Sequence, residues 1–199
     1  MNGDFLIKEY ELCFEQLRFY DKRQANLVKF VLTLTSSIAT ALFAVSQVKD
    51  VSPIFFWKSL FAVTSIVFIA TLVVYVALLQ NRLYFVFVAR QINAIRKYFL
   101  EHECQQFKEN QMYLSTKIRA SSLLSIHSAM LLGVTLISSL YAAVTFYALL
   151  HIINCPQPIP VFLGLVVVVL VSVAEIGIGH LFLFYQGKQP AAGAGLTST

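Results

Sequence analysis

Four long stretches of the chain hold almost no charged residue, and they constrain the fold more than any other feature. They cover residues 30–48, 59–81, 120–153 and 161–185. Only the last one contains an acidic side chain, that of Glu175. Roughly 17–25 helical residues cross the hydrocarbon core of a bilayer, and each stretch is long enough. A spanning barrel would instead show alternating segments of about 10 residues, which the sequence lacks. The sequence therefore predicts four transmembrane helices.

The composition supports lipid as the main solvent of this chain. Of its 199 residues, 58% are hydrophobic and 13% are charged, whereas a soluble domain carries about 25% charged residues. A soluble fold of this length could not bury that much apolar surface. The net charge is +5, but the basic residues lie beside the apolar stretches and no nucleic-acid-binding motif is present. We therefore expect a lipid bilayer as partner and no nucleic acid.

The distribution of Lys and Arg predicts the topology. Both the N-terminal segment and the connection after the second stretch are rich in basic residues, which places them in the cytoplasm by the positive-inside rule. The expected fold is an all-α integral membrane protein, a four-helix transmembrane bundle with a cytoplasmic helical extension. Its localisation would be the cell membrane, the inner membrane in a bacterium, with both termini cytoplasmic. The expected parts are an amphipathic helix at 1–24, spans at 25–48, 54–81, 120–153 and 160–186, a cytoplasmic helical hairpin at 82–119, and a disordered tail at 187–199.

A stripe of apolar side chains follows the second span. Its members recur at intervals of 3, 4, 3 and 4 residues, an a/d pattern: Phe85, Val88, Ile92, Ile95 and Phe99. No Pro or Gly interrupts the chain between residues 54 and 132, so we expect one helix from the second span to about His102 and a second helix around 106–119. A similar seam is expected in the N-terminal helix. The seams could cover each other within one chain, or could build a homo-oligomer or bind a cytoplasmic protein.

Small and hydroxyl residues form stripes within two of the spans. The first span carries Thr33, Ser37, Thr40, Ala44 and Gln47, and the third carries Ser128, Thr135, Ser138, Ala142 and Thr145. Such stripes let membrane helices approach closely and form hydrogen bonds across the contact. Close packing is one interpretation, and a polar pathway between helices is the other.

Glu175 is the most unusual residue of the fourth span. A carboxylate at this depth costs several kcal/mol on some scales, so it should face protein or water. Ser172 at i−3 and Gly179 at i+4 give it a small face that could meet either hydroxyl stripe. His180 lies about 140° around the helix from Glu175, so the two are not a pair, and His127 has a comparable depth. Membrane-embedded polar candidates are thus Glu175, His180, His127 and Ser172. Glu175 is either a neutral carboxyl bound to hydroxyls or a proton or cation site.

Motifs for enzymatic chemistry are absent from the sequence. It contains no metalloprotease, hydrolase, P-loop or dinucleotide-binding pattern, and its three cysteines are scattered. We therefore expect no catalytic residue, no metal site, no cofactor and no enzymatic activity. Arg90, Arg96 and Lys97 are candidates for binding an anion or lipid headgroups, although we favour a solvated charged face beside the membrane as their explanation.

Two classes of function remain open. The layout of residues 5–118, an amphipathic helix, two spans and a long basic helix, resembles that of the SLATT-type bacterial membrane effectors. That resemblance implies oligomerisation and perturbation of the membrane on a trigger, while the two further spans depart from it. The first hypothesis is accordingly a non-enzymatic homo-oligomeric pore or channel, effector or sensor whose cytoplasmic helices assemble or receive a signal. The alternative is a small proton- or cation-linked transporter that uses Glu175.

Overall fold

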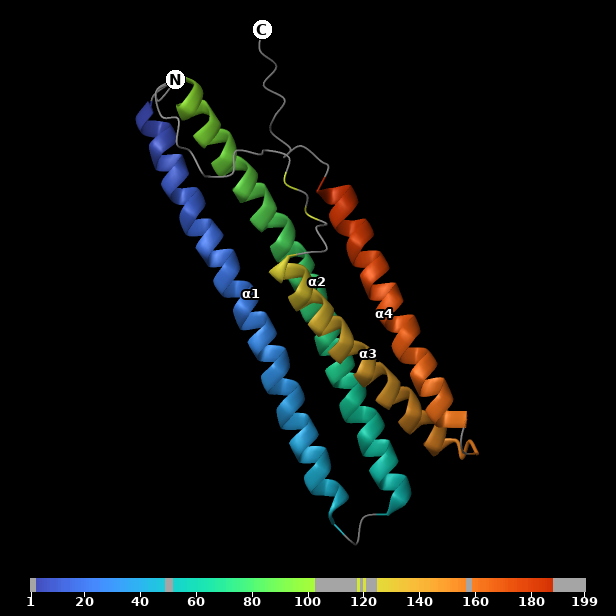
Figure 1. Ribbon diagram of the computed structural model, residues 1–199. Helices are drawn as coiled ribbons and strands as arrows, with labels where there is room; N and C mark the ends of the chain where they lie inside the picture. The colour runs from blue at the N-terminus through green and yellow to red at the C-terminus, as the bar shows by residue number, and fades with distance from the viewer. Residues whose placement is uncertain are drawn as a thin grey trace. The chain divides into compact units, whose positions relative to one another are not determined.

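The structure is a computed structural model that describes residues 3–48, 52–102, 118, 120, 125–156 and 159–187 (Figure 1). These residues form four α-helices and no strand: α1 (Gly3–Ser46), α2 (Pro53–His102), α3 (Ile126–Ile152) and α4 (Ile159–Gln186). All four are long and apolar enough to cross a membrane. The expected helix around 106–119, apart from residue 118, and the expected tail, apart from residue 187, lie outside the described residues.

The helices begin and end where local chemistry favours it. Ser52 precedes α2, and its Oγ accepts a hydrogen bond from the Phe55 N–H at 3.4 Å, which caps the helix start. Ser125 caps α3 in the same way, accepting from Ser128 N–H at 3.2 Å. The third span was expected from residue 120, whereas α3 begins at Ile126, directly after its capping serine. After α3, Asn154 adopts a left-handed backbone with φ 57°, a common way to stop a helix.

The chain divides into two compact units. Unit 1 consists of Met1–Ala25, Leu79–Ser122 and Leu181–Thr199, and unit 2 consists of Asn26–Leu78 and Leu123–His180. Unit 1 holds most of the basic residues, and unit 2 holds most of the four apolar stretches. The division therefore follows the change from charged to uncharged sequence.

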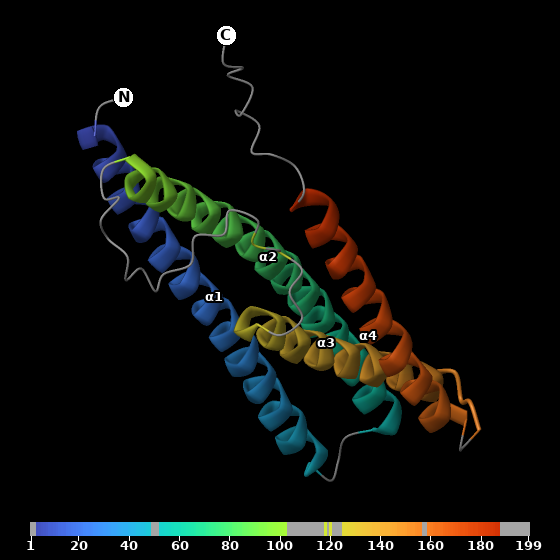
Figure 2. The ribbon, with the colours of Figure 1, turned by 45° about the horizontal axis from the view of Figure 1, so that its top comes forward.

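In unit 2, α3 contacts each of the other three helices. The Tyr141 hydroxyl donates to the main-chain oxygen of Thr35 in α1 at 3.1 Å. Thr145 Oγ donates to Thr64 Oγ in α2 at 2.9 Å, and α4 is bound through the glutamate described below. Figures 1 and 2 show α3 crossing α2 at an angle. Hydroxyl groups thus hold together a unit whose surroundings are otherwise apolar.

The buried face of α2 in unit 2 has the spacing of a helix that packs along its whole length. Its buried residues recur at intervals of 4, 3, 4, 3 and 4: Leu60, Thr64, Val67, Thr71, Val74 and Leu78. The hydroxyls of Thr64 and Thr71 donate to carbonyl oxygens one turn earlier, Thr64 to Leu60 at 2.7 Å and Thr71 to Phe68 at 2.8 Å. These bonds let hydroxyl residues lie fully buried without an unpaired donor.

In unit 1, α1 and α2 pack through apolar and polar contacts. Asn81 Nδ2 donates to the Tyr20 main-chain oxygen at 2.9 Å, and Arg96 Nε donates to the Tyr10 hydroxyl at 2.9 Å. The Arg96 guanidinium also lies over the rings of Tyr10 and Phe14. The α1 side of this contact buries Leu6 and Cys13, and burial together with nearby Glu9 raises the pKa of the Cys13 thiol.

The apolar stripe predicted on α2 is only partly buried. Ile92 and Ile95 are buried, whereas Phe85, Val88 and Phe99 are half-buried. The deepest positions of α2 in unit 1 also include polar residues, namely Asn81, Arg82 and Asn93. The buried arc is wider than an a/d seam because α2 contacts α1 and also residues 118, 120 and 187.

Candidate functional site

Glu175 lies on the packed face of α4 in unit 2 and is only 6% exposed. Two small residues lie about one turn from it on the same face of α4: Ser172, which is half-buried, and Gly179, which is buried. Ser138 Oγ of α3 donates to Glu175 Oε1 at 2.7 Å. The Tyr75 hydroxyl of α2 donates to the main-chain oxygen of Glu175 at 2.6 Å. Three helices therefore meet at this one residue.

Three oxygen atoms at this site are buried and have no hydrogen-bond partner among the described residues: Glu175 Oε2, Thr135 Oγ and Ser172 Oγ. Thr135 is only 1% exposed and lies close enough to the carboxyl and to the Tyr75 hydroxyl to interact with both, although its Oγ does not reach full hydrogen-bond geometry with either. No basic side chain of the described residues forms an ion pair with Glu175. Buried polar atoms without partners are uncommon in folded proteins, so this cluster is the strongest candidate for a functional site.

The sequence predicted only part of this arrangement. Of the two hydroxyl stripes that could meet Glu175, the one on α3 does so through Ser138 and Thr135. The stripe on α1 does not, because Thr33 and Ser37 are exposed. Tyr75 was not identified from the sequence. The sequence did contain a signal for it. Thr64, Thr71 and Tyr75 are separated by seven and four residues, so they share one face of α2.

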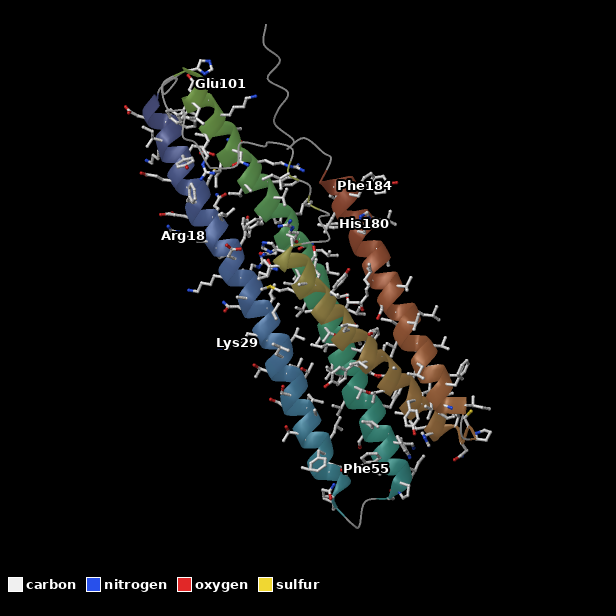
Figure 3. All side chains as sticks on the ribbon, in the orientation of Figure 1. Arg18, Lys29, Phe55, Glu101, His180 and Phe184 are labelled. Atoms are coloured by element: carbon white, nitrogen blue, oxygen red, sulfur yellow. The ribbon has the colours of Figure 1, made fainter. Side chains whose placement is uncertain are left out.

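The histidine candidates do not join the site. His180 is exposed on α4 (Figure 3), and His127 is half-buried near the start of α3. Lys29 of α1, a conceivable partner of the carboxylate, is exposed as well (Figure 3). Glu175 is therefore bound by hydroxyl groups and not by a cationic side chain of the described residues.

A second feature of unit 2 is the exposed face of α1. Only 6% of the most apolar stretch of α1 is buried, compared with 39% in α2 and 33% in α3. The hydroxyl stripe of Thr33, Ser37, Thr40 and Ala44 lies entirely on the exposed side. The other described helices therefore do not cover this stripe.

The exposed face of α4 has a different composition. Its exposed side chains are large and apolar, as expected for a lipid-facing helix: Val161, Phe162, Leu165, Val169, Leu170, Val173, Ile176 and Ile178. Large apolar side chains such as Phe30, Leu32 and Phe43 are exposed on α1 as well, and what distinguishes α1 from α4 is the additional exposed stripe of small and hydroxyl residues.

The described residues contain no group of three or more His, Cys, Asp or Glu side chains that could hold a metal ion. Comparison with known protein families, curated proteins and solved structures finds no match. Functional conclusions therefore depend on the geometry of the chain itself.

The basic candidates of unit 1 do not form one anion site. Arg90 donates from Nε and Nη2 to the Ile118 oxygen at 3.0 and 2.6 Å, and from Nη1 to the Gly187 oxygen at 2.8 Å. Arg96 is held by α1, and Lys97 lies 3.6 Å from Glu101 on the surface. Burial lowers the pKa of the Arg90 guanidinium. Because its donors bind main-chain oxygens, this arginine acts as a clamp between segments of unit 1.

Proposed function

We propose that the chain is a non-enzymatic multi-pass membrane protein that works as a homo-oligomer, of the pore, effector or sensor kind, with α1 at the contact between subunits. The observation that carries this proposal is the exposed hydroxyl face of α1. Small and hydroxyl residues are enriched where membrane helices touch, since they allow close approach and hydrogen bonding. Lipid-facing surfaces are instead large and apolar, as on α4.

The register of α1 supports a single continuous contact. Thr33 and Thr40 share their heptad position with Phe5, Leu12 and Phe19, because all five are separated by multiples of seven residues. All five are exposed. Residues repeated every seven positions lie on one side of a helix, so this side of α1 is exposed, apolar in its N-terminal part, polar at Asn26, and hydroxyl at Thr33 and Thr40.

A second copy of the chain is the occupant that best fits this line. Copies inserted with the same topology present α1 in parallel, so each heptad position meets its own equivalent across the symmetry axis. Parallel pairing needs no register shift, and it covers the apolar and the hydroxyl parts at the same time. A cytoplasmic protein would reach only the part outside the bilayer.

Disulfide cross-linking in membranes tests this proposal. Thr40→Cys should give a covalent dimer on mild oxidation, because the two copies of residue 40 face each other. Leu165→Cys, on the exposed face of α4, is the matched control and should stay monomeric, as should the parent chain. Equal cross-linking of the two variants, or none in Thr40→Cys, would exclude α1 as the contact.

Ion flux from liposomes separates a pore from a sensor. A pore should release potassium from liposomes that hold the parent chain, and Ser37→Leu, which places a bulky side chain on the α1 face, should abolish the release. The control Phe162→Leu, on the exposed apolar face of α4, should leave the potassium release unchanged. An assembly that cross-links but releases no ions favours the sensor or effector kind.

A further inference from the structure

We propose that Glu175, Thr135, Ser138 and Ser172 form a proton-binding site in unit 2, in which the bound proton lies on Glu175 Oε2. This site is independent of the subunit contact proposed above. The four side chains come from α3 and α4, and all are buried or half-buried. The site takes a proton as its ligand and alternates between a carboxylic acid and a carboxylate.

The hydrogen bonds of the site favour the acid form. Ser138 donates to Oε1 at 2.7 Å, so Oε1 acts as the carbonyl oxygen of the acid. An ionised carboxylate would place a negative charge in a buried site where no basic side chain of the described residues pairs with it, which is costly in a low-dielectric environment. A proton on Oε2 converts that acceptor into a donor.

Two buried hydroxyl oxygens near Glu175 are candidate acceptors for this donor. Thr135 Oγ lies beside the carboxyl, and Ser172 Oγ lies one turn before Glu175 on α4; both are buried without a partner among the described residues. A hydroxyl group can accept one hydrogen bond and rotate its own hydrogen toward a nearby carbonyl. A proton on Oε2 can thus be shared with one of these hydroxyl oxygens, and it leaves the buried site without a net charge.

The surrounding groups fit a proton better than a metal cation. Tyr75 of α2 is the titratable group of the described residues that faces Glu175 from another helix, and it donates its proton to the main chain. No described Lys, Arg or His pairs with the carboxyl. A calcium ion takes six to eight oxygen ligands, whereas this site offers one carboxyl and three hydroxyls, and α3 and α4 continue unbroken through it.

Infrared spectroscopy of the full chain in lipid at neutral pH tests the proposal. The parent should show the C=O stretch of a protonated carboxyl, and Glu175→Gln should lose it. Glu15→Gln, which changes an exposed carboxylate of α1, is the matched control and should keep the band while losing carboxylate absorption. Ser138→Ala should shift the band to higher frequency, because the carbonyl oxygen loses its donor.

Two results would overturn the proposal. If the parent showed no band of a protonated carboxyl, and Glu175→Gln lost carboxylate absorption, Glu175 would be ionised in the parent. If the carboxylate absorption of the parent changed with added sodium or potassium and not with pH, the site would bind a monovalent cation. Neither result depends on the oligomeric state, so failure of this proposal is distinguishable from failure of the α1 contact.

Discussion

Replacing Glu175 by Leu or by Gln separates the hydrogen bonds of the site from its shape. Gln keeps an oxygen that accepts from Ser138 at the position of Oε1, and its amide group donates toward Thr135 or Ser172, which have no partner in the parent. We expect Glu175→Gln to have the free energy of unfolding of the parent within about 0.5 kcal/mol, because it reproduces the hydrogen bonds of the acid form.

Leu removes the acceptor and leaves the buried Ser138 hydroxyl without it. A buried polar group that loses its partner costs about 1–3 kcal/mol in soluble proteins, whereas hydrogen bonds within membranes average about 0.6 and reach about 1.7 kcal/mol. The apolar side chain gains little from burial, since lipid is already an apolar solvent. We therefore expect Glu175→Leu to be about 1–2 kcal/mol less stable than Glu175→Gln.

Unfolding in mixed micelles of increasing SDS fraction, followed by circular dichroism, measures this difference. Ile178→Leu is the matched control, because Ile178 is exposed on the same helix, and it should leave the transition where it is in the parent. The reasoning fails if Glu175→Leu and Glu175→Gln unfold at the same SDS fraction, because the hydroxyl groups would then contribute nothing to the contact between α3 and α4.

Three further predictions concern the topology and unit 1. An impermeant maleimide added to intact cells should label Cys155 and should not label a cysteine introduced by Glu11→Cys. The exposed position 11 replaces Cys13 as the probe because Cys13 is buried and its raised pKa slows alkylation on either side of the membrane. Ile95→Asp should unfold unit 1, seen as lost helicity, because it buries an unpaired charge. Arg90→Gln should leave the chain helical but speed amide hydrogen exchange in the segments that the guanidinium clamps, whereas unchanged exchange would show that the clamp carries no stability.

The helices could be predicted from the sequence because lipid imposes a simple rule on it. Uncharged stretches of sufficient length become spans, and the absence of Pro and Gly after the second stretch predicted one helix to about His102, where α2 ends. The boundaries depended on local chemistry. Ser125 begins α3 later than the charge pattern indicated, and Pro160 lies inside the first turn of α4, where a proline is well tolerated.

The site and the exposed face required the structure. Helical spacing shows which residues share a face, but not which helix that face meets. Two hydroxyl stripes were equally suited to meet Glu175, and only the stripe with Ser138 does so. The charge of Arg90 made it a candidate for binding anions or lipid headgroups, or for a solvated face, whereas its donors bind the main-chain oxygens of residues 118 and 187, which are far apart in sequence.

The mass of the assembly in lipid nanodiscs, measured by native mass spectrometry, tests the central claim most directly. One chain weighs 22.3 kDa, so a homo-oligomer must give an integral multiple of that mass. We predict a multiple of at least two for the parent chain and a shift to the single-chain mass when Ser37→Leu and Thr40→Leu are combined. A single-chain mass for the parent in lipid, with all four helices formed, would contradict the account.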